Sequence, residues 1–342
     1  MHRLTRLARP AAVPLVAVAG ILLLLAALLV AGGHDPAVAL RALWRGAFGS
    51  ADALLSATLV RATPLILAGL SVALAFRAGL LNIGAEGQLL AGAGAAAAVG
   101  ILFGAALGPA AVLVVLAAGA LAGAAWAGIA AALRLRGVPE VISTLMLNFV
   151  ALYGVGYLVR GPLQEPSHVY PQSLPLPESA RLPVLLPHTR LHAGIVVALA
   201  AAAVLWYALQ HTAAGFRVRA SGANPDAARS AGGIAVARTT AGAFLASGVL
   251  AGLAGASEVQ GVTYALYENL SPGYGYTAIA VALLAGLDPR LVVPSGILFG
   301  ALEAGAGAMQ RDAGVPAAVV TVVEAAVILA VLAVTRVRRA ER

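Results

Sequence analysis

Residues 84–133 read GAEGQLLAGAGAAAAVGILFGAALGPAAVLVVLAAGALAGAAWAGIAAAL and contain a single charged side chain, that of Glu86. Two runs of apolar and small residues, 84–104 and 109–133, meet at a Gly-Pro pair. Each run reaches the roughly 20 residues that a helix needs to cross about 30 Å of hydrocarbon. The segment therefore predicts two successive membrane-spanning helices.

The composition of the whole chain agrees with this local pattern. The 342 residues are 61% hydrophobic and only 11% charged, with a mean hydropathy of +0.92. No water-soluble domain needs that much apolar surface. The apolar runs are long and continuous, whereas a β-barrel would show alternating segments of roughly ten residues. We therefore expect an all-α polytopic membrane protein.

Boundaries set by Pro, Gly and charged clusters predict about ten spans. The eighth, 274–287, is too short for a full crossing, so we expect it to be broken or re-entrant. The first follows Arg3, Arg6 and Arg9 and is longer than the apolar core of roughly 7 to 15 residues in a signal peptide, so we interpret it as an uncleaved helix. The predicted spans are 11–32, 57–76, 84–104, 109–133, 139–159, 193–210, 239–260, 274–287, 291–309 and 316–335.

The distribution of arginine predicts the orientation. With the N-terminus inside, 15 of the 22 arginines fall in cytoplasmic segments and seven in external ones, the bias typical of membrane proteins. Both termini are therefore expected in the cytoplasm. The predicted organisation is a cytoplasmic N-terminus (1–10), a transmembrane domain (11–335) with external segments 33–56 and 161–192 and a cytoplasmic loop 211–238, and a cytoplasmic tail (336–342).

Several kinds of chemistry are disfavoured by what the sequence lacks. The chain has no cysteine and no lysine, so it offers no thiolate and no phosphate-binding loop of the usual type. Its six histidines form no metal-ligand pair at helical spacing, and no nucleophile elbow is present. The net charge of +8 is explained by membrane orientation rather than by nucleic acid. We expect neither a catalytic site, nor a metal, nor a directly bound cofactor.

Polar residues inside apolar runs are the candidate functional residues, because burying them in a membrane is costly. Glu140, Thr144 and Asn148 follow each other at helical spacing and predict a polar stripe on one helix face. Such residues line a hydrophilic path for a solute, or they join helices by hydrogen bonds, and both interpretations stay open. The candidate path residues are Asn82, Glu86, Gln88, Thr144, Asn148, Glu258 and Glu303.

Two loops have distinctive composition. In 211–238, Asn224 is a suitable cap, Pro225 suits a first helical turn and Gly232 follows as a stop, so a short surface helix is expected. It is either a docking element or an ordinary solvated basic loop. The external segment 161–192 holds seven of the 18 prolines, and it is either a cap for a soluble partner or an ordinary ordered loop.

Three motifs carry a family resemblance. GLLNIGAEGQ at 79–88, VPEVISTLMLNFVALY at 138–153 and GFRVRASGANPDAARSAGGI at 215–234 resemble the permease subunits of branched-chain amino acid, ribose and nucleoside ABC importers. The nucleoside branch, which depends on a lipoprotein of the BMP type, is the most similar. The resemblance extends from about Leu54 to Arg336.

The resemblance implies a permease in a bacterial cytoplasmic membrane, paired with a second identical or homologous permease. Cytoplasmic ATPases would hydrolyse ATP, and an extracytoplasmic binding lipoprotein would deliver the solute. The loop helix would then be the coupling helix that contacts the ATPase. The E-A-A-x-x-x-G signature of other importers is not present in strict form. The residues assigned to coupling are Gly215, Arg217, Asn224, Pro225, Asp226, Arg229 and Gly232.

Other interpretations remain. A permease of the same family for ribose or another sugar would share most of these motifs. A proton-coupled secondary transporter would use Glu86, Glu258 and Glu303 as a relay, although the inverted halves of many such folds are not evident. A purely structural membrane subunit would need the polar stripe for assembly alone.

Overall fold

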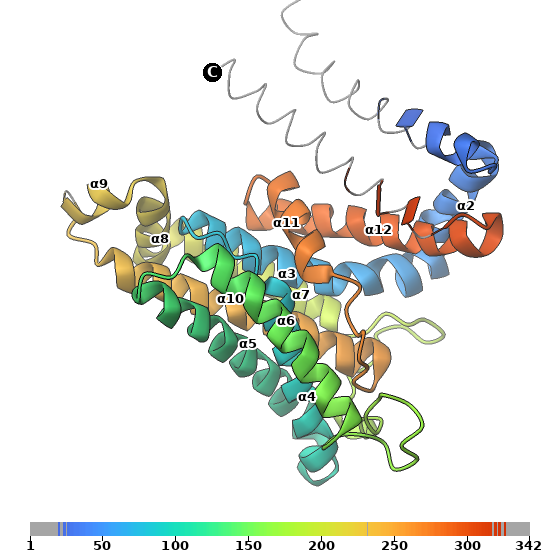
Figure 1. The fold of residues 1–342 in the computed structure, drawn as a ribbon, viewed down its shortest axis with the longest axis horizontal. Helices are drawn as coiled ribbons and strands as arrows, with labels where there is room; N and C mark the ends of the chain where they lie inside the picture. Colours follow the sequence, from blue (N-terminus) through green and yellow to red (C-terminus); the bar gives the residue numbers. More distant parts are fainter. Residues whose placement is uncertain are drawn as a thin grey trace, which may run out of the picture. The chain divides into compact units, whose positions relative to one another are not determined.

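The computed structural model (Figure 1) describes residues 20, 23–24, 26–230, 232–316, 318–319, 321–322 and 325. The predicted terminal spans, the N-terminus 1–10 and the tail 336–342 lie mostly or wholly outside these residues. The described part is mostly helical, and isolated β-bridges occur in its loops. Its α-helices are α2 (Pro36–Phe48), α3 (Leu59–Arg77), α4 (Ala85–Leu107), α5 (Ala111–Leu135), α6 (Glu140–Arg160), α7 (Gly194–His211), α8 (Ala213–Ala223), α9 (Pro225–Ser230), α10 (Val236–Glu258), α11 (Tyr274–Leu284) and α12 (Pro289–Ala313).

Six helical stretches among the described residues are long and apolar enough to cross a membrane, which makes the chain a multi-pass membrane protein. One of them, Ala85–Leu135, contains both α4 and α5, joined by a short 3₁₀ turn at Gly108–Ala110. The predicted spans from 57–76 to 291–309 match α-helices whose ends differ by no more than four residues. The count of about ten is not confirmed. The eighth run is α11, which has 11 residues and is too short to span.

The chain divides into two compact units, which are described separately. The larger, Ala62–Ile297, is built on α4, α5 and α10, which lie side by side (Figure 1). A Cβ added to Gly123 would meet the carbonyl of Gly248, and one added to Gly252 would meet that of Gly119. The glycine pairs Gly119–Gly123 of α5 and Gly248–Gly252 of α10 therefore face each other and let two backbones touch.

The smaller unit, residues 1–61 and 298–342, contains α2 and the end of α12. Asp35 caps α2 by accepting hydrogen bonds from the backbone N–H groups of Ala37 and Val38, and Pro36 occupies the first turn. A Cβ on Gly46 would meet Ala308. The helical part of the expected external segment 33–56 is thus packed on another helix.

Candidate functional site

The loop between α3 and α4 holds Asn82, the first of the candidate path residues along the chain. Gly79, whose φ is +79°, turns the chain after α3. The fully buried Asn82 then exchanges a reciprocal pair of amide hydrogen bonds with Gln88, both at 3.1 Å. Asn82 Nδ2 also donates to Ser247 Oγ of α10 at 3.1 Å, and its Oδ1 accepts from the N–H of Gly84 at 3.0 Å. Asn82 therefore ties the start of α4 to α10.

Asn148 of α6 binds the same helix start from another side. Its Oδ1 accepts from the N–H of Gly87 at 2.8 Å, one of the first-turn donors of α4 that have no partner within the helix. Its Nδ2 donates to the carbonyl of Ile83 at 2.9 Å and to Tyr276 Oη at 3.2 Å. Asn148 thus uses both ends of its amide to hold α4 and α11.

Glu86 lies where two helices begin. It is 6% exposed in the first turn of α4, and its Oε2 accepts from the N–H of Gly275, in the first turn of α11, at 2.7 Å. Helix N-termini carry partial positive charge and free N–H groups, which a carboxylate complements. A Cβ on Gly275 would meet the backbone of Glu86, so these two starts pack closely.

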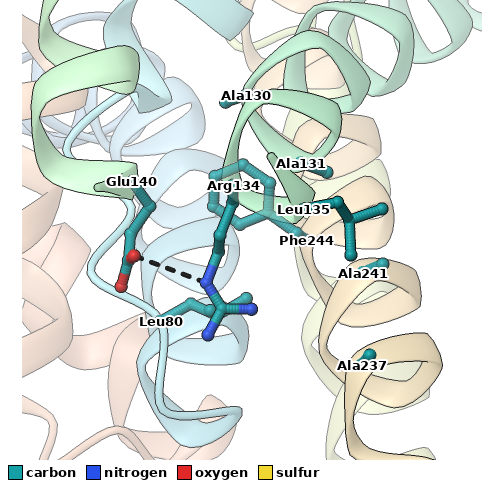
Figure 2. A pocket seen from close by; sticks show the side chains of 9 residues that line it. All are labelled: Leu80, Ala130, Ala131, Arg134, Leu135, Glu140, Ala237, Ala241 and Phe244. Carbon is teal, nitrogen blue, oxygen red and sulfur yellow. Dashed lines mark ion pairs between the residues drawn. The ribbon is translucent and has the colours of Figure 1, made fainter. Parts of the chain in front are cut away.

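Thr144 completes the polar stripe predicted on α6. It is 1% exposed, packs against Gly84 and donates to the carbonyl of Glu140 at 2.7 Å. Figure 2 shows the end of the stripe, where Glu140 meets Arg134 at 3.4 Å beside Phe244 of α10. The cavity that these residues line is about 10 Å³, at the limit of what holds a single water. The cavity at this end of the stripe is therefore too small for a solute.

The structure brings five of the seven candidate path residues together in what we call the polar network: Asn82, Glu86, Gln88, Thr144 and Asn148 with their partners Ser247, Gly275 and Tyr276. Tyr276, 41% exposed, is a member through which the network reaches the surface. Glu258 lies elsewhere, buried on α10 and eleven residues after Ser247, about 16 Å along the helix. Glu303 is half-buried on α12, in the other compact unit.

Sequence reasoning missed the partner residues. Ser247 and Tyr276 lie within apolar runs without a motif, and their role depends on which helices become neighbours. Asn82 and Glu86 are four residues apart but do not share a helix face, because α4 begins at Ala85 and Asn82 belongs to the loop. Gly79 and Gly84, on either side of Asn82, are compatible with such a break.

The segment 211–238 is more helical than predicted. Asn224 Oδ1 accepts from the N–H groups of Asp226 and Ala227 at 3.1 and 3.0 Å, so the expected cap and the six-residue helix α9 are present. An additional helix, α8, precedes it. A Cβ on Gly222 of α8 would meet the carbonyl of Arg77 and the N–H of Gly79. The end of α8 therefore touches the loop that carries Asn82.

The residues assigned to coupling divide by location. Gly215 is buried where α8 packs on the end of α7, since a Cβ there would meet the carbonyl of Ala208. Asp226 pairs with Arg229 at 2.9 Å on the exposed side of α9. Arg217 and Gly232 are exposed and line a groove beside α10. The group extends over α8, α9 and the turn after α9, with a break between the helices at Asn224, and it has both packed and exposed residues.

The segment 161–192 is tied to the chain that follows α10. The N–H of Ser173 donates to the carbonyl of Leu266 at 2.9 Å, and the N–H of Leu266 donates back to Ser173 Oγ at 2.9 Å. Gln260 Nε2 donates to the carbonyl of Ala180 at 2.7 Å. Prolines stiffen the segment, and these bonds fix it as an ordered cover over the end of α10.

His192 lies in the segment that precedes α7, yet it is only 1% exposed. Its Nδ1 accepts from the N–H of Gly194 at 3.2 Å, and its ring lies against Gly194 and Gly261. Burial, together with the positive charge of Arg190, lowers the pKa of His192 to about 4. This side chain is a neutral part of the core, which a count of histidines in loops does not reveal.

Comparison with known proteins finds a family of transport permeases and several similar members. Residues 54–332 match the family described as the permease component of branched-chain amino acid transport systems. The chain is 40% identical to the guanosine ABC transporter permease protein NupP of Bacillus subtilis, over 93% of this chain and 91% of that protein. It is 42% identical to the glucose ABC transporter permease protein TsgB13 of Haloferax volcanii, over 80% and 75%. It is 33% identical to the nucleoside ABC transporter permease protein NupB of Lactococcus lactis, over 94% and 90%. No solved structure matches significantly.

Proposed function

The chain belongs to the family of permease components of branched-chain amino acid transport systems, and we propose that it is the membrane-spanning subunit of an ABC importer for nucleosides. The substrate class is supported by the guanosine and nucleoside permeases, which align over at least 90% of their own length. The resemblance of the three sequence motifs supports the same class.

The observation that carries the mechanism is the contact between α8 and the loop that holds Asn82. Gly222 and Gly79 bring the two backbones together, and a side chain on Gly222 would separate them. Asn82 in turn bonds to α4 and α10. A movement of the surface helices α8 and α9 is therefore passed directly to the buried polar network.

The polar network supplies the proposed path. Ribose hydroxyls and base edges lose water when they enter a membrane, and amide, hydroxyl and carboxylate groups replace it. In this conformation those groups bond to one another or to backbone groups, so a path opens only when α6 or α11 moves away from the start of α4. Tyr276 bonds to Asn148 and is exposed, which makes it the first group that a solute would meet. Glu258 and Glu303 are weaker candidates.

The proposed energy source is a separate ATPase that contacts α9. The chain has no lysine and hence no phosphate-binding loop of the usual type, so nucleotide energy enters through a surface. Among the described residues, the α8–α9 element presents an exposed capped helix for this contact. Asn224, Pro225 and Asp226 begin that helix, and Arg229 belongs to its last turn.

The remaining parts of the proposal concern topology and partners. Both termini and α8–α9 are cytoplasmic, because 15 of 22 arginines then lie inside. The ordered segment 161–192 is external and receives the binding lipoprotein. A second permease, identical or homologous, completes the importer in the bacterial cytoplasmic membrane. The chain binds no cofactor itself, because ATP is hydrolysed by the partner.

A sugar importer is the second candidate, because the glucose permease of Haloferax volcanii is 42% identical. The test is co-purification of the chain with an ATPase and a binding protein encoded beside it. Guanosine should stimulate ATP hydrolysis of the complex, and glucose should not. The opposite pattern would establish the sugar importer, and failure to bind any ATPase would refute both.

Topology has its own test, because the chain has no cysteine. A single cysteine at Gln172 should react with an impermeant maleimide in intact cells. A cysteine at Arg229 should react only after lysis. The reverse order would invert the proposed orientation.

A further inference from the structure

A large groove, here called the α10 groove, lies beside the start of α10. Its volume is about 980 Å³, and its walls come from the ends of α3 and α7, the start of α8, residues 232–235 and the first three turns of α10. Pockets that hold small molecules usually measure about 300–1,000 Å³. The groove belongs wholly to the larger compact unit.

The α10 groove changes character along its length. Arg217 of α8 and Arg238, near the start of α10, line it, and both are exposed. Gly242 and Ala246, also exposed, line it further along α10, and Ala246 lies ten residues, about 15 Å, after the start of that helix. There the walls are small and apolar, and a Cβ added to Gly242 would meet no atom within 4 Å. The groove thus has a basic mouth and an open apolar stretch along α10, which we call its interior.

The two arginines at the mouth differ from three other arginines of the chain, which are ion-paired. Arg134 pairs with Glu140 (Figure 2), Arg229 with Asp226 and Arg290 with Asp288. Within the part of the chain that the structure describes, no ion pair joins Arg217 or Arg238 to a carboxylate. No acidic residue lines the groove. The mouth therefore holds two positive charges that an anion from outside the chain would complement.

We propose that the α10 groove binds an anionic phospholipid of the cytoplasmic leaflet. Its phosphate lies between Arg217 and Arg238, and an acyl chain extends past Gly242 toward Ala246. Basic pockets between membrane helices on the cytoplasmic side are suited to anionic head groups. A free phosphate would leave the apolar interior open, whereas a phospholipid matches both parts. The orientation rests on the proposed function, which places this end of the bundle in the cytoplasm.

The consequence concerns α8. The bound lipid would contact α7, α8 and α10 together and hold α8 in the position where Gly222 touches the Asn82 loop. Anionic lipid would then act as a structural partner of the element to which we assign coupling.

The test uses the full chain in its importer complex, delipidated and titrated with phosphatidylglycerol or phosphatidylcholine of identical acyl chains. Native mass spectrometry counts the bound lipid. The wild type should prefer phosphatidylglycerol by about tenfold. Arg217→Gln combined with Arg238→Gln should abolish this preference, and Arg136→Gln, an exposed arginine outside the groove, should keep it.

A second pair of variants tests the apolar part. Gly242→Leu fills the interior and should lower binding of both lipids at this site. Gly154→Leu is the matched control, because Gly154 is also an exposed helical glycine with open space beside it, on α6. If a variant does not fold, a cysteine at Gly242 in the wild-type background gives an independent readout. Its reaction with a lipophilic maleimide should be slowed by phosphatidylglycerol more than by phosphatidylcholine.

The outcomes separate this inference from the proposed function. Equal affinity of the wild type for both lipids, or an unchanged preference in the double arginine variant, overturns the lipid site. Cross-linking of the Gly242 cysteine to another subunit also overturns it, because a protein would then fill the groove. Guanosine-stimulated ATP hydrolysis, measured in the same preparation, reports on the proposed function alone.

Discussion

At the scale of single residues, the buried side-chain amides of Asn82 and Asn148 act as helix caps. The first N–H groups of α4 have no partner within their helix, and no water is available at membrane depth. Asn82 accepts a hydrogen bond from the N–H of Gly84, and Asn148 accepts one from the N–H of Gly87, each from a different element. A side chain that satisfies a helix end also fixes where the next helix lies. The same residues therefore support the fold, and in the proposed path they would also offer polar groups to a solute.

Replacing Asn148 tests its supporting role. Asn148→Ala leaves the N–H of Gly87 and the carbonyl of Ile83 without this partner, which should destabilise the protein by about 1–3 kcal/mol. Ser143→Ala on the same helix removes only a bond to the carbonyl of Glu140 and should cost less. Thermal unfolding in detergent compares the two. Equal stability of both variants would show that the amide bonds do not stabilise this end of α4.

The buried His192 predicts a dependence of stability on pH. Its ordinary pKa of 6.5 applies to the unfolded chain, and the folded value is about 4. Between these values the unfolded chain binds more protons, so stability is full above pH 6.5 and falls as the pH drops toward 4. The loss should approach about 3 kcal/mol. Unfolding midpoints measured across this range should show the slope.

Two variants test whether His192 is the group that causes this dependence of stability on pH. His192→Asn should flatten the curve, because it removes the group that titrates. His188→Asn should keep it, since His188 is exposed and has a positive φ that Asn tolerates. An identical slope in wild type and His192→Asn would mean that another group causes the loss.

At the scale of elements, alanine substitutions at two glycines on α10 should change stability in opposite directions. Gly252→Ala places a methyl group against the carbonyl of Gly119, where neither backbone can yield, and should cost about 1–3 kcal/mol. Gly242→Ala meets open space and should stabilise the helix by up to about 1 kcal/mol. Thermal unfolding of the two proteins measures both changes in stability. A Gly252→Ala protein as stable as Gly242→Ala would contradict the close packing of α5 and α10.

The helix α9 should be required for coupling. The N–H of Ala228 donates to the carbonyl of Asn224 at 3.0 Å, so Ala228→Pro removes an interior bond and breaks the helix at a cost of about 3 kcal/mol. ATP-driven uptake should be lost while the protein stays in the membrane. Asp226→Lys, at the positive helix end, should reduce uptake only partially. Ala228→Ser is the control. Wild-type uptake by Ala228→Pro, with the ATPase still bound, would show that energy enters elsewhere.

How far the sequence predicts these elements depends on whether the signal is local. Length and hydropathy placed the described spans, and the Asn224 cap was recognisable because its partners are two and three residues away. Helix α8 was missed, because its glycines Gly215 and Gly222 weaken its helical propensity and it is stabilised by packing on α7 and on Gly79. The partners of Asn82 and Asn148 are distant in sequence, so their bonds follow only from the assembled bundle.

At the scale of the whole molecule, the central claim is that the chain carries nucleosides using energy from ATP. A proton-coupled transporter would use buried carboxylates such as Glu86 and would need no ATPase. The deciding measurement is guanosine uptake into proteoliposomes that contain the permease, its ATPase and its binding protein, with ATP available to the ATPase and a protonophore present. We predict uptake that requires ATP and the binding protein and that the protonophore does not change. Uptake that proceeds without ATP and collapses with the protonophore would contradict the account.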